Sequence, residues 1–343
     1  MKKIVEQLHQ TLLLLILSIV MHLASAQGKY PVRTWSSNEY KGGNAVMAVI
    51  QDSTGIAYLA CHKGLVIFDG ARFQLIKMPK NSMPLWFANG ENGRVYVSAE
   101  DELGYITKEA SGHTYHSLTH LIPDYAQGFG SVWEVAQTNY GTYFRTTHYL
   151  FRYYQNNIEV LPRENYEGTS FDVIFTIDST LYLRKYNLGI GKMIGKTFEL
   201  LPNGDFFKNI KVNAILPFDN RTMVVTRQNG IFVMDEAGVT EFENEIQEQL
   251  KIDKAYHATI FKNKIAIATL TNGTYLLNNE GKLLEHFDKK YKLSEAATYV
   301  YFDNMGGLWT TTYNGLWRAD LNDHIKVYDG ISNEKTLILD MKR

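Results

Sequence analysis

Residues 51–73 read QDSTGIAYLACHKGLVIFDGARF, and weaker copies of this stretch recur at nearly fixed intervals along the 343-residue chain. The best second copy lies at residues 302–328, where DNMGGLW at 303–309 matches DSTGIAY at 52–58. Each copy holds short apolar runs separated by polar turns with glycine, which predicts four short antiparallel strands per unit. Such units are typical of the blades of a β-propeller.

The number of units follows from the residue that begins the third strand of each copy. These residues are Gly64, Gly104, Tyr149, Gly189, Gly230, Gly273 and Gly315. Their spacings of 40 to 45 residues suit four-stranded blades. A flat sheet of this many strands would leave long unprotected edges, whereas a closed ring leaves only short ones. The sequence therefore predicts an all-β, seven-bladed β-propeller of four-stranded antiparallel blades.

A segment at either end of the repeat array could supply the outer strand of the seventh blade. Residues 31–36 and residues 324–328 both resemble outer strands. We expect residues 31–36 to complete the seventh blade, with the propeller spanning residues 27–329. Residues 330–343 hold a turn and a new apolar run, which we interpret as a linker or the start of a further repeat. The chain is accordingly expected to be the N-terminal part of a longer protein.

One stretch, residues 241–252, has a helical period. Phe242, Ile246 and Leu250 lie four residues apart there, which predicts a short amphipathic helix at the exit of the fifth unit.

The first residues have the pattern of a secretory signal peptide. Lys2 and Lys3 precede an apolar run at residues 12–20, and Ala24-Ser25-Ala26 supplies a small-x-small cleavage site. The apolar run is shorter than the roughly 20 residues of a membrane span. We therefore expect residues 1–26 to be removed and the mature chain to be periplasmic, with an uncleaved anchor as the alternative.

The net charge and the lack of certain sequence motifs argue against several classes of function. The formal net charge of −1 becomes −2 when Lys2, Lys3 and Glu6 are removed, so no basic excess points to nucleic acid. Cys61 is the only cysteine, which excludes an internal disulfide. The chain has no CxxC or HExxH motif, and we expect neither a metal site nor a cofactor.

At this point the repeat resembles a known family. Residues 49–55 (VIQDSTG) followed by residues 64–70 (GLVIFDG) resemble the two-component-regulator propeller repeat of large bacterial transmembrane sensors. Residues 92–97 and 102–106 are similar to the second repeat of its ligand-binding, triple-tyrosine-motif subgroup. The resemblance covers roughly residues 30–330 and is strongest in units one, two and seven.

The resemblance implies an extracytoplasmic sensor. In that family, periplasmic propellers precede a triple-tyrosine immunoglobulin-like domain, a membrane helix and a cytoplasmic output such as a histidine kinase or a DNA-binding helix-turn-helix. The expected function is thus ligand sensing, with a conformational signal passed to downstream domains of the same longer chain. Any catalytic activity would belong to that output domain.

Candidate ligand-binding residues lie in the two loop sets that surround a propeller axis. One set begins the inner strands, and the other joins the second and third strands. If both open on one face, they form an aromatic-rimmed funnel of mixed charge, which suits a sugar, an oligosaccharide or another small ligand. The candidates are His62, Trp86, Glu100, Trp133, Lys185, Asn213, Arg227, His257, Tyr299 and Tyr313.

Two other function classes stay open. A propeller enzyme acting on polysaccharide, as a lyase or hydrolase, could use Glu100 and Asp101 with His62 or His257, but no spacing motif selects them. We therefore assign no catalytic residue. A non-catalytic protein-binding scaffold, or a homodimer, is equally compatible with exposed apolar turns.

Overall fold

The computed structural model describes residues 28–110, 112–162, 171–293, 296–322, 325–327 and 337–339. The signal peptide expected at residues 1–26 lies outside these residues, as does most of the further repeat expected at residues 330–343. The chain divides into two compact units, Thr34–Arg318 and the two chain ends Met1–Arg33 with Ala319–Arg343. Among the described residues, no helix has both the length and the apolar character needed to cross a membrane.

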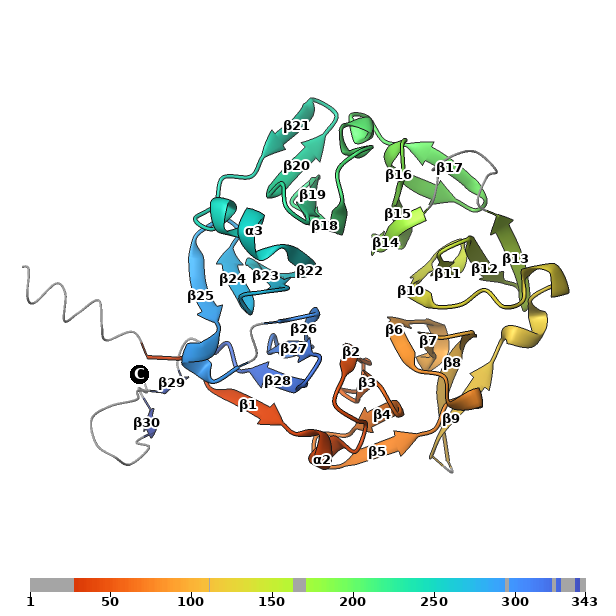
Figure 1. The fold of residues 1–343 in the computed structure, drawn as a ribbon, viewed down its shortest axis with the longest axis horizontal. Helices are drawn as coiled ribbons and strands as arrows, with labels where there is room; N and C mark the ends of the chain where they lie inside the picture. The colour runs from red at the N-terminus through yellow and green to blue at the C-terminus, as the bar shows by residue number, and fades with distance from the viewer. Residues whose placement is uncertain are drawn as a thin grey trace, which may run out of the picture. The chain divides into compact units, whose positions relative to one another are not determined.

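Seven four-stranded antiparallel sheets surround a central axis, with β2, β6, β10, β14, β18, β22 and β26 as their innermost strands (Figure 1). In chain order the first six blades are β2 (Val46–Gln51), β3 (Ala57–Cys61), β4 (Gly64–Phe68), β5 (Phe73–Ile76); β6 (Pro84–Asn89), β7 (Val95–Ala99), β8 (Glu102–Glu109), β9 (Gly112–Ser117); β10 (Val132–Thr138), β11 (Gly141–Thr146), β12 (Tyr149–Tyr154), β13 (Asn157–Pro162); β14 (Phe171–Ile177), β15 (Thr180–Lys185), β16 (Gly189–Ile194), β17 (Thr197–Leu200); β18 (Val212–Phe218), β19 (Arg221–Thr226), β20 (Ile231–Asp235), β21 (Gly238–Glu241); and β22 (Ala255–Phe261), β23 (Lys264–Thr269), β24 (Thr274–Asn278), β25 (Leu283–Phe287). The prediction of a seven-bladed propeller is confirmed.

The seventh blade combines both ends of the array. It consists of β26 (Tyr299–Phe302), β27 (Leu308–Thr312), β28 (Gly315–Ala319) and, as its outer strand, β1 (Val32–Trp35). Residues 31–36 thus complete the last blade, as expected. Trp35 stacks on Trp309 with ring centroids 5.1 Å apart, so an aromatic contact helps to close the ring.

The second unit contains its own small sheet. Strand β29 (Ile325–Val327) pairs with β30 (Leu337–Leu339), and Lys29 forms an isolated bridge with Val327. Whether this sheet begins a further repeat stays a prediction.

A carboxylate-closed turn explains why the repeat recurs. Asp52 Oδ1 accepts hydrogen bonds from the backbone N–H groups of Thr54 and Ile56. Its counterpart Asp303 accepts from Met305 and Gly307, and also from the Trp309 indole at 2.9 Å and the Arg318 guanidinium at 2.6 Å. Gly55 and Gly306 have φ of 89° and 81°, which favours glycine. The shared D-x-x-G pattern therefore serves folding.

Short helices lie between blades or, at Glu91–Gly93, between two strands of one blade. They are α2 (Ser37–Tyr40) and α3 (Gln247–Asp253), with 3-10 turns at Pro79–Asn81, Glu91–Gly93, Thr119–Leu121, Asp124–Ala126, Gly204–Phe207 and Lys289–Tyr291. The helix expected at residues 241–252 begins later, because the Asn244 side chain bonds the backbone of Phe242 and Ile246 and so holds a turn there. Ile246 and Leu250 are buried, as its apolar face predicts.

Candidate functional site

Both predicted loop sets open at the same end of the propeller. In an antiparallel blade, the start of the first strand and the turn between the second and third strands lie at one end. A cavity of about 200 Å³ opens there, and all seven blades contribute to it. We call it the axial funnel; it is lined by Met47, Leu85, Trp86, Trp133, Glu134, Arg145, Asp172, Val173, Phe175, Lys211, Val212, Asn213, Arg227, Tyr256, His257 and Thr298.

A ring of β-bulges builds the wall of the funnel. In each of the first six inner strands the register with the second strand shifts at the second residue, for example between Val132 and Glu134. A bulge leaves one residue unpaired and re-aims its side chain. The six skipped residues, which we call the bulge ring, are Met47, Leu85, Trp133, Asp172, Asn213 and Tyr256, and all of them line the funnel.

Two ion-paired carboxylates sit in this wall. Glu134 pairs with Arg145, with both side chains about nine-tenths buried. Asp172 pairs with Arg184 at 2.6 Å and with Lys211. Arg184 is 2% exposed and also donates to the backbone oxygens of Phe207 and Lys208. The two arginines are held in place by the blades, because Arg184 and Arg145 each donate to a carboxylate and to a backbone oxygen.

Four rings form the floor of the funnel, between it and the other end of the central channel. We call Trp86, Phe175, His257 and Tyr299 the aromatic floor. The His257 ring stacks on Tyr299 at 4.2 Å and on Phe175 at 6.1 Å, and Trp86 meets both His257 and Tyr299 edge-on. Trp86, Phe175 and His257 line both the funnel and the cavity at the other end, and Tyr299 lines the latter, so this contiguous group of rings lies between the two.

His257 is neutral within this floor. Burial lowers the pKa of its imidazole from 6.5 to about 3, because a charged ring would be desolvated there. Its Nδ1 accepts a hydrogen bond from the Val300 N–H at 3.3 Å. The proton of the neutral ring therefore resides on Nε2.

The ten sequence-predicted residues occupy different places. Trp86, Trp133, Asn213, Arg227 and His257 line the funnel, and Tyr299 belongs to its floor. His62 and Tyr313 instead line a separate cavity between blades one and seven, together with Lys63 and Asn314.

The remaining two candidates lie apart from the funnel lining. Glu100 is exposed, and its backbone bridges Ser131. Lys185 is buried, with its ammonium 5.9 Å from the Phe171 ring and 5.7 Å from the Phe198 ring. The aliphatic part of the Lys185 side chain packs inside the blade, so its position in a turn did not predict where the side chain points.

Sequence reasoning missed several residues of the funnel wall. Glu134, Arg145, Asp172, Lys211 and Tyr256 were not selected. A signal was present for two of them: Asp172 and Tyr256 are each the second residue of an inner strand, although the bulge that turns them toward the axis depends on the register with the neighbouring strand.

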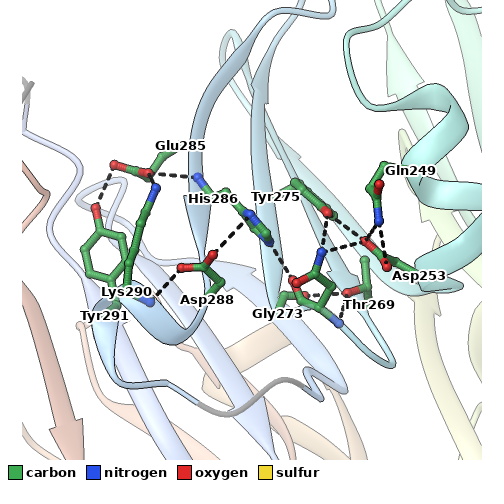
Figure 2. Close-up of polar contacts among 11 residues, drawn as sticks. Gln249, Asp253, Thr269, Gly273, Tyr275, Glu285, His286, Asp288, Lys290 and Tyr291 are labelled. Carbon is green, nitrogen blue, oxygen red and sulfur yellow. Dashed lines mark hydrogen bonds and ion pairs between the residues drawn. The ribbon is translucent and has the colours of Figure 1, made fainter. Parts of the chain in front are cut away.

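A second polar cluster lies in blade six and joins α3 to β24 (Figure 2). The carboxylate of Asp253, 4% exposed, accepts hydrogen bonds from Gln249, from the Asn272 amide at 2.9 Å and from the Tyr275 hydroxyl at 2.6 Å. His286 stacks on Tyr275. Burial, with the neighbouring Asp253, raises the pKa of Tyr275. The polar groups of this cluster already have hydrogen-bond partners, so the cluster holds α3 against β24.

Neither of these sites has the donor set of a metal centre. Across the described ranges, no group of three or more His, Cys, Asp or Glu side chains is arranged to hold a metal ion.

Comparison with known proteins supports the fold. No family model and no curated protein matches the sequence. Among solved structures, a streptogramin B lyase is 14% identical with a TM-score of 0.66, over 85% of this chain and 98% of that one. A catalytically inactive His-to-Ala variant of virginiamycin B lyase from Staphylococcus aureus, with Quinupristin, is 14% identical with a TM-score of 0.64, over 86% and 100% of the chains.

Another similar structure is the extracellular domain of a hybrid two component system, BT4673, from B. thetaiotaomicron. It is 17% identical with a TM-score of 0.65, over 88% of this chain and 41% of that one. The present chain thus spans about two fifths of that neighbour. At these identities the likeness concerns the fold alone, and two functional classes, lyase and sensor, share it.

Proposed function

We propose that this chain is the extracytoplasmic ligand-sensing propeller of a bacterial transmembrane regulator, related to the two-component-regulator propeller family. Three observations support the proposal: the repeat motifs at residues 49–55 and 64–70, the signal-peptide pattern of residues 1–26, and the likeness to the extracellular domain of BT4673. The observation that carries it is the bulge ring, which turns one side chain from each of six blades into a single funnel.

The funnel is suited to a carbohydrate or a similar small ligand. Trp133 is 43% exposed, and its indole N–H donates to the Thr147 hydroxyl at 3.2 Å. This bond fixes the ring plane, which lets an apolar sugar face stack on it. Charged and amide groups across the funnel can hydrogen-bond hydroxyl groups.

Binding would act through the blades. A ligand that contacts several inner strands stabilises the arrangement of blades that fits it and shifts the population toward that state. In the proposed regulator, downstream domains of the longer chain read this shift as a change in domain placement and pass it through the membrane.

The lyase neighbours make catalysis the competing function, and the state of His257 weighs against it. A histidine that acts as a general base needs a free acceptor nitrogen and a pKa near the working pH. His257 has Nδ1 bonded to Val300, and its pKa is near 3. Of the described histidines, it alone lines the funnel. We therefore favour binding without turnover.

A thermal-shift screen with neutral and acidic mono- and oligosaccharides tests the function. A ligand at about 100 times its Kd should stabilise the domain by roughly 2.7 kcal/mol. Trp133→Ala should remove this shift, whereas Tyr140→Ala should keep it. Tyr140 is the matched control, since it follows the opposite end of the same strand, β10, and is 37% exposed. Product release, or no shift with any sugar, would overturn the proposal.

A further inference from the structure

The bulge ring of the axial funnel is divided into two chemically different arcs. In blades one to three the bulge ring presents Met47, Leu85 and Trp133, and in blades four to six it presents Asp172, Asn213 and Tyr256. The first arc is apolar and the second is polar. A ligand that fills the funnel must therefore have one apolar face and one polar edge.

The lining of the funnel as a whole carries an excess of positive charge. Its carboxylates are already neutralised: Glu134 by Arg145, and Asp172 by both Arg184 and Lys211. Arg227 lines the same cavity, and no ion pair joins it to a carboxylate in the described part of the chain. Its backbone N–H donates to the Lys211 oxygen at 2.9 Å, which holds it beside that lysine. Two carboxylates against three cations, Arg145, Lys211 and Arg227, leave the funnel lining able to take an anion.

A buried acceptor stands beside this charge. The Asn213 amide donates from Nδ2 to the Tyr256 backbone oxygen at 2.8 Å, so its orientation is set. Its Oδ1 is buried and has no hydrogen-bond partner in the structure. A buried acceptor without a donor is costly, and a ligand hydroxyl would satisfy it.

From these three features we infer that the ligand is an acidic sugar, a pyranose that bears a carboxylate; this inference rests on the proposed function. The carboxylate faces the Arg227 guanidinium, a hydroxyl donates to Asn213 Oδ1, and the apolar ring face lies on Trp133. Arginine suits this role because its planar fork matches a carboxylate.

Paired sugars that differ only in the carboxylate test the inference. Isothermal titration would compare glucuronate with glucose, and galacturonate with galactose, each as the monosaccharide and as the corresponding oligosaccharide. We expect binding of the acidic member of a pair, weakened about tenfold to a hundredfold by Arg227→Gln. Arg221→Gln is the matched control, because Arg221 is exposed at the opposite end of the same strand, β19. It should leave affinity unchanged.

A second variant keeps the test decisive if Arg227→Gln does not fold. Arg227→Lys retains the charge but loses the two-pronged geometry, so it should bind the acidic sugar more weakly than the parent chain.

The outcomes separate the inference from the function on which it rests. If a neutral sugar binds as tightly as its acidic partner, or if both Arg227 variants bind like the parent, the acidic assignment fails while the sugar-binding function stands. If no sugar of either kind binds, both fail.

Discussion

The two ends of the central channel are built from the same inner strands but differ in chemistry. The axial funnel is lined by five charged residues: Glu134, Arg145, Asp172, Lys211 and Arg227. At the other end, which we call the opposite mouth, the cavity is lined by the later residues of the inner strands, such as Asn89, Gln137, Thr176, Thr259 and Tyr301, and this lining includes no Asp, Glu, Lys or Arg. The turns that carry Asp52 and Asp303 lie at this end but outside that lining.

The difference has a structural cause. At the funnel end, a bulge leaves one residue in each of the first six inner strands without a pairing partner. At the opposite mouth, the turns of the best repeat copies are closed by their own carboxylates, Asp52 and Asp303. The unpaired side chains at the funnel end can therefore serve ligand binding, whereas the turn carboxylates at the other end are needed for the fold.

The largest expected effect concerns the charges behind the funnel. Arg184→Met should lower the unfolding free energy by about 3 kcal/mol or more, because it leaves a mostly buried Asp172 without its buried cation partner. Urea unfolding measures this. Lys192→Gln in the next strand breaks an exposed pair with Glu199 and should cost less than about 1 kcal/mol. Equal losses in both variants would show that the Arg184 pair is not structural.

At the opposite mouth, Asp303→Ala should destabilise the domain by about 2 kcal/mol without changing ligand affinity. The substitution leaves the donors of Met305, Gly307 and Trp309 without their acceptor. Urea unfolding gives the stability, and titration of the same preparation gives the ligand affinity. Asp219→Asn, in an exposed turn at the same end, should change neither. A loss of ligand affinity in the Asp303 variant would contradict the claim that only the funnel end binds the ligand.

The aromatic floor predicts a pH dependence of stability. Between pH 6.5 and about 3 the unfolded chain binds a proton at His257 that the folded protein does not. Stability should therefore fall as the pH falls below 6.5, by up to about 1.4 kcal/mol per pH unit from this group. His257→Phe should flatten the slope of unfolding free energy against pH. His120→Gln, on an exposed histidine, should leave it unchanged; an unaltered slope in the Phe variant would contradict a neutral floor.

The smallest effect compares two asparagines, one at each end. Asn213 donates to the Tyr256 oxygen in the funnel, and Asn89 donates to the Gln51 oxygen at the opposite mouth. Each Ala variant should lose about 1 kcal/mol of stability, because each loses one such bond. Asn213→Ala alone should also weaken ligand binding, by about fivefold to tenfold. Titration of both variants decides this, and equal affinities would remove Asn213 from the site.

The fold could be predicted from the sequence because its determinants are local. Glycine turns and short apolar runs recur with a period, so counting them gave seven blades, and the outer strand at residues 31–36 followed from closure. The start of α3 was placed too early, because the competing bond of Asn244 depends on its side-chain geometry.

The funnel could be predicted only in part. Trp133, Asn213 and Arg227 were found because they stand in loop sets that every propeller turns toward its axis. The bulges were not, because a bulge is a property of the register between two strands rather than of either strand alone. Asp172 and Lys211 are 39 residues apart, and no local pattern joins them. Lys185 shows the converse: a turn position did not reveal that its side chain packs inside the blade.

The most direct test of the account is a crystal structure of the chain soaked with the sugar that gives the largest thermal shift. We predict density for the ligand in the axial funnel, with its ring on Trp133 and its polar edge toward Arg227 and Asn213. Density at the opposite mouth or in the cavity beside His62 and Tyr313, with the funnel empty, would contradict the claim that the bulge ring forms the binding site.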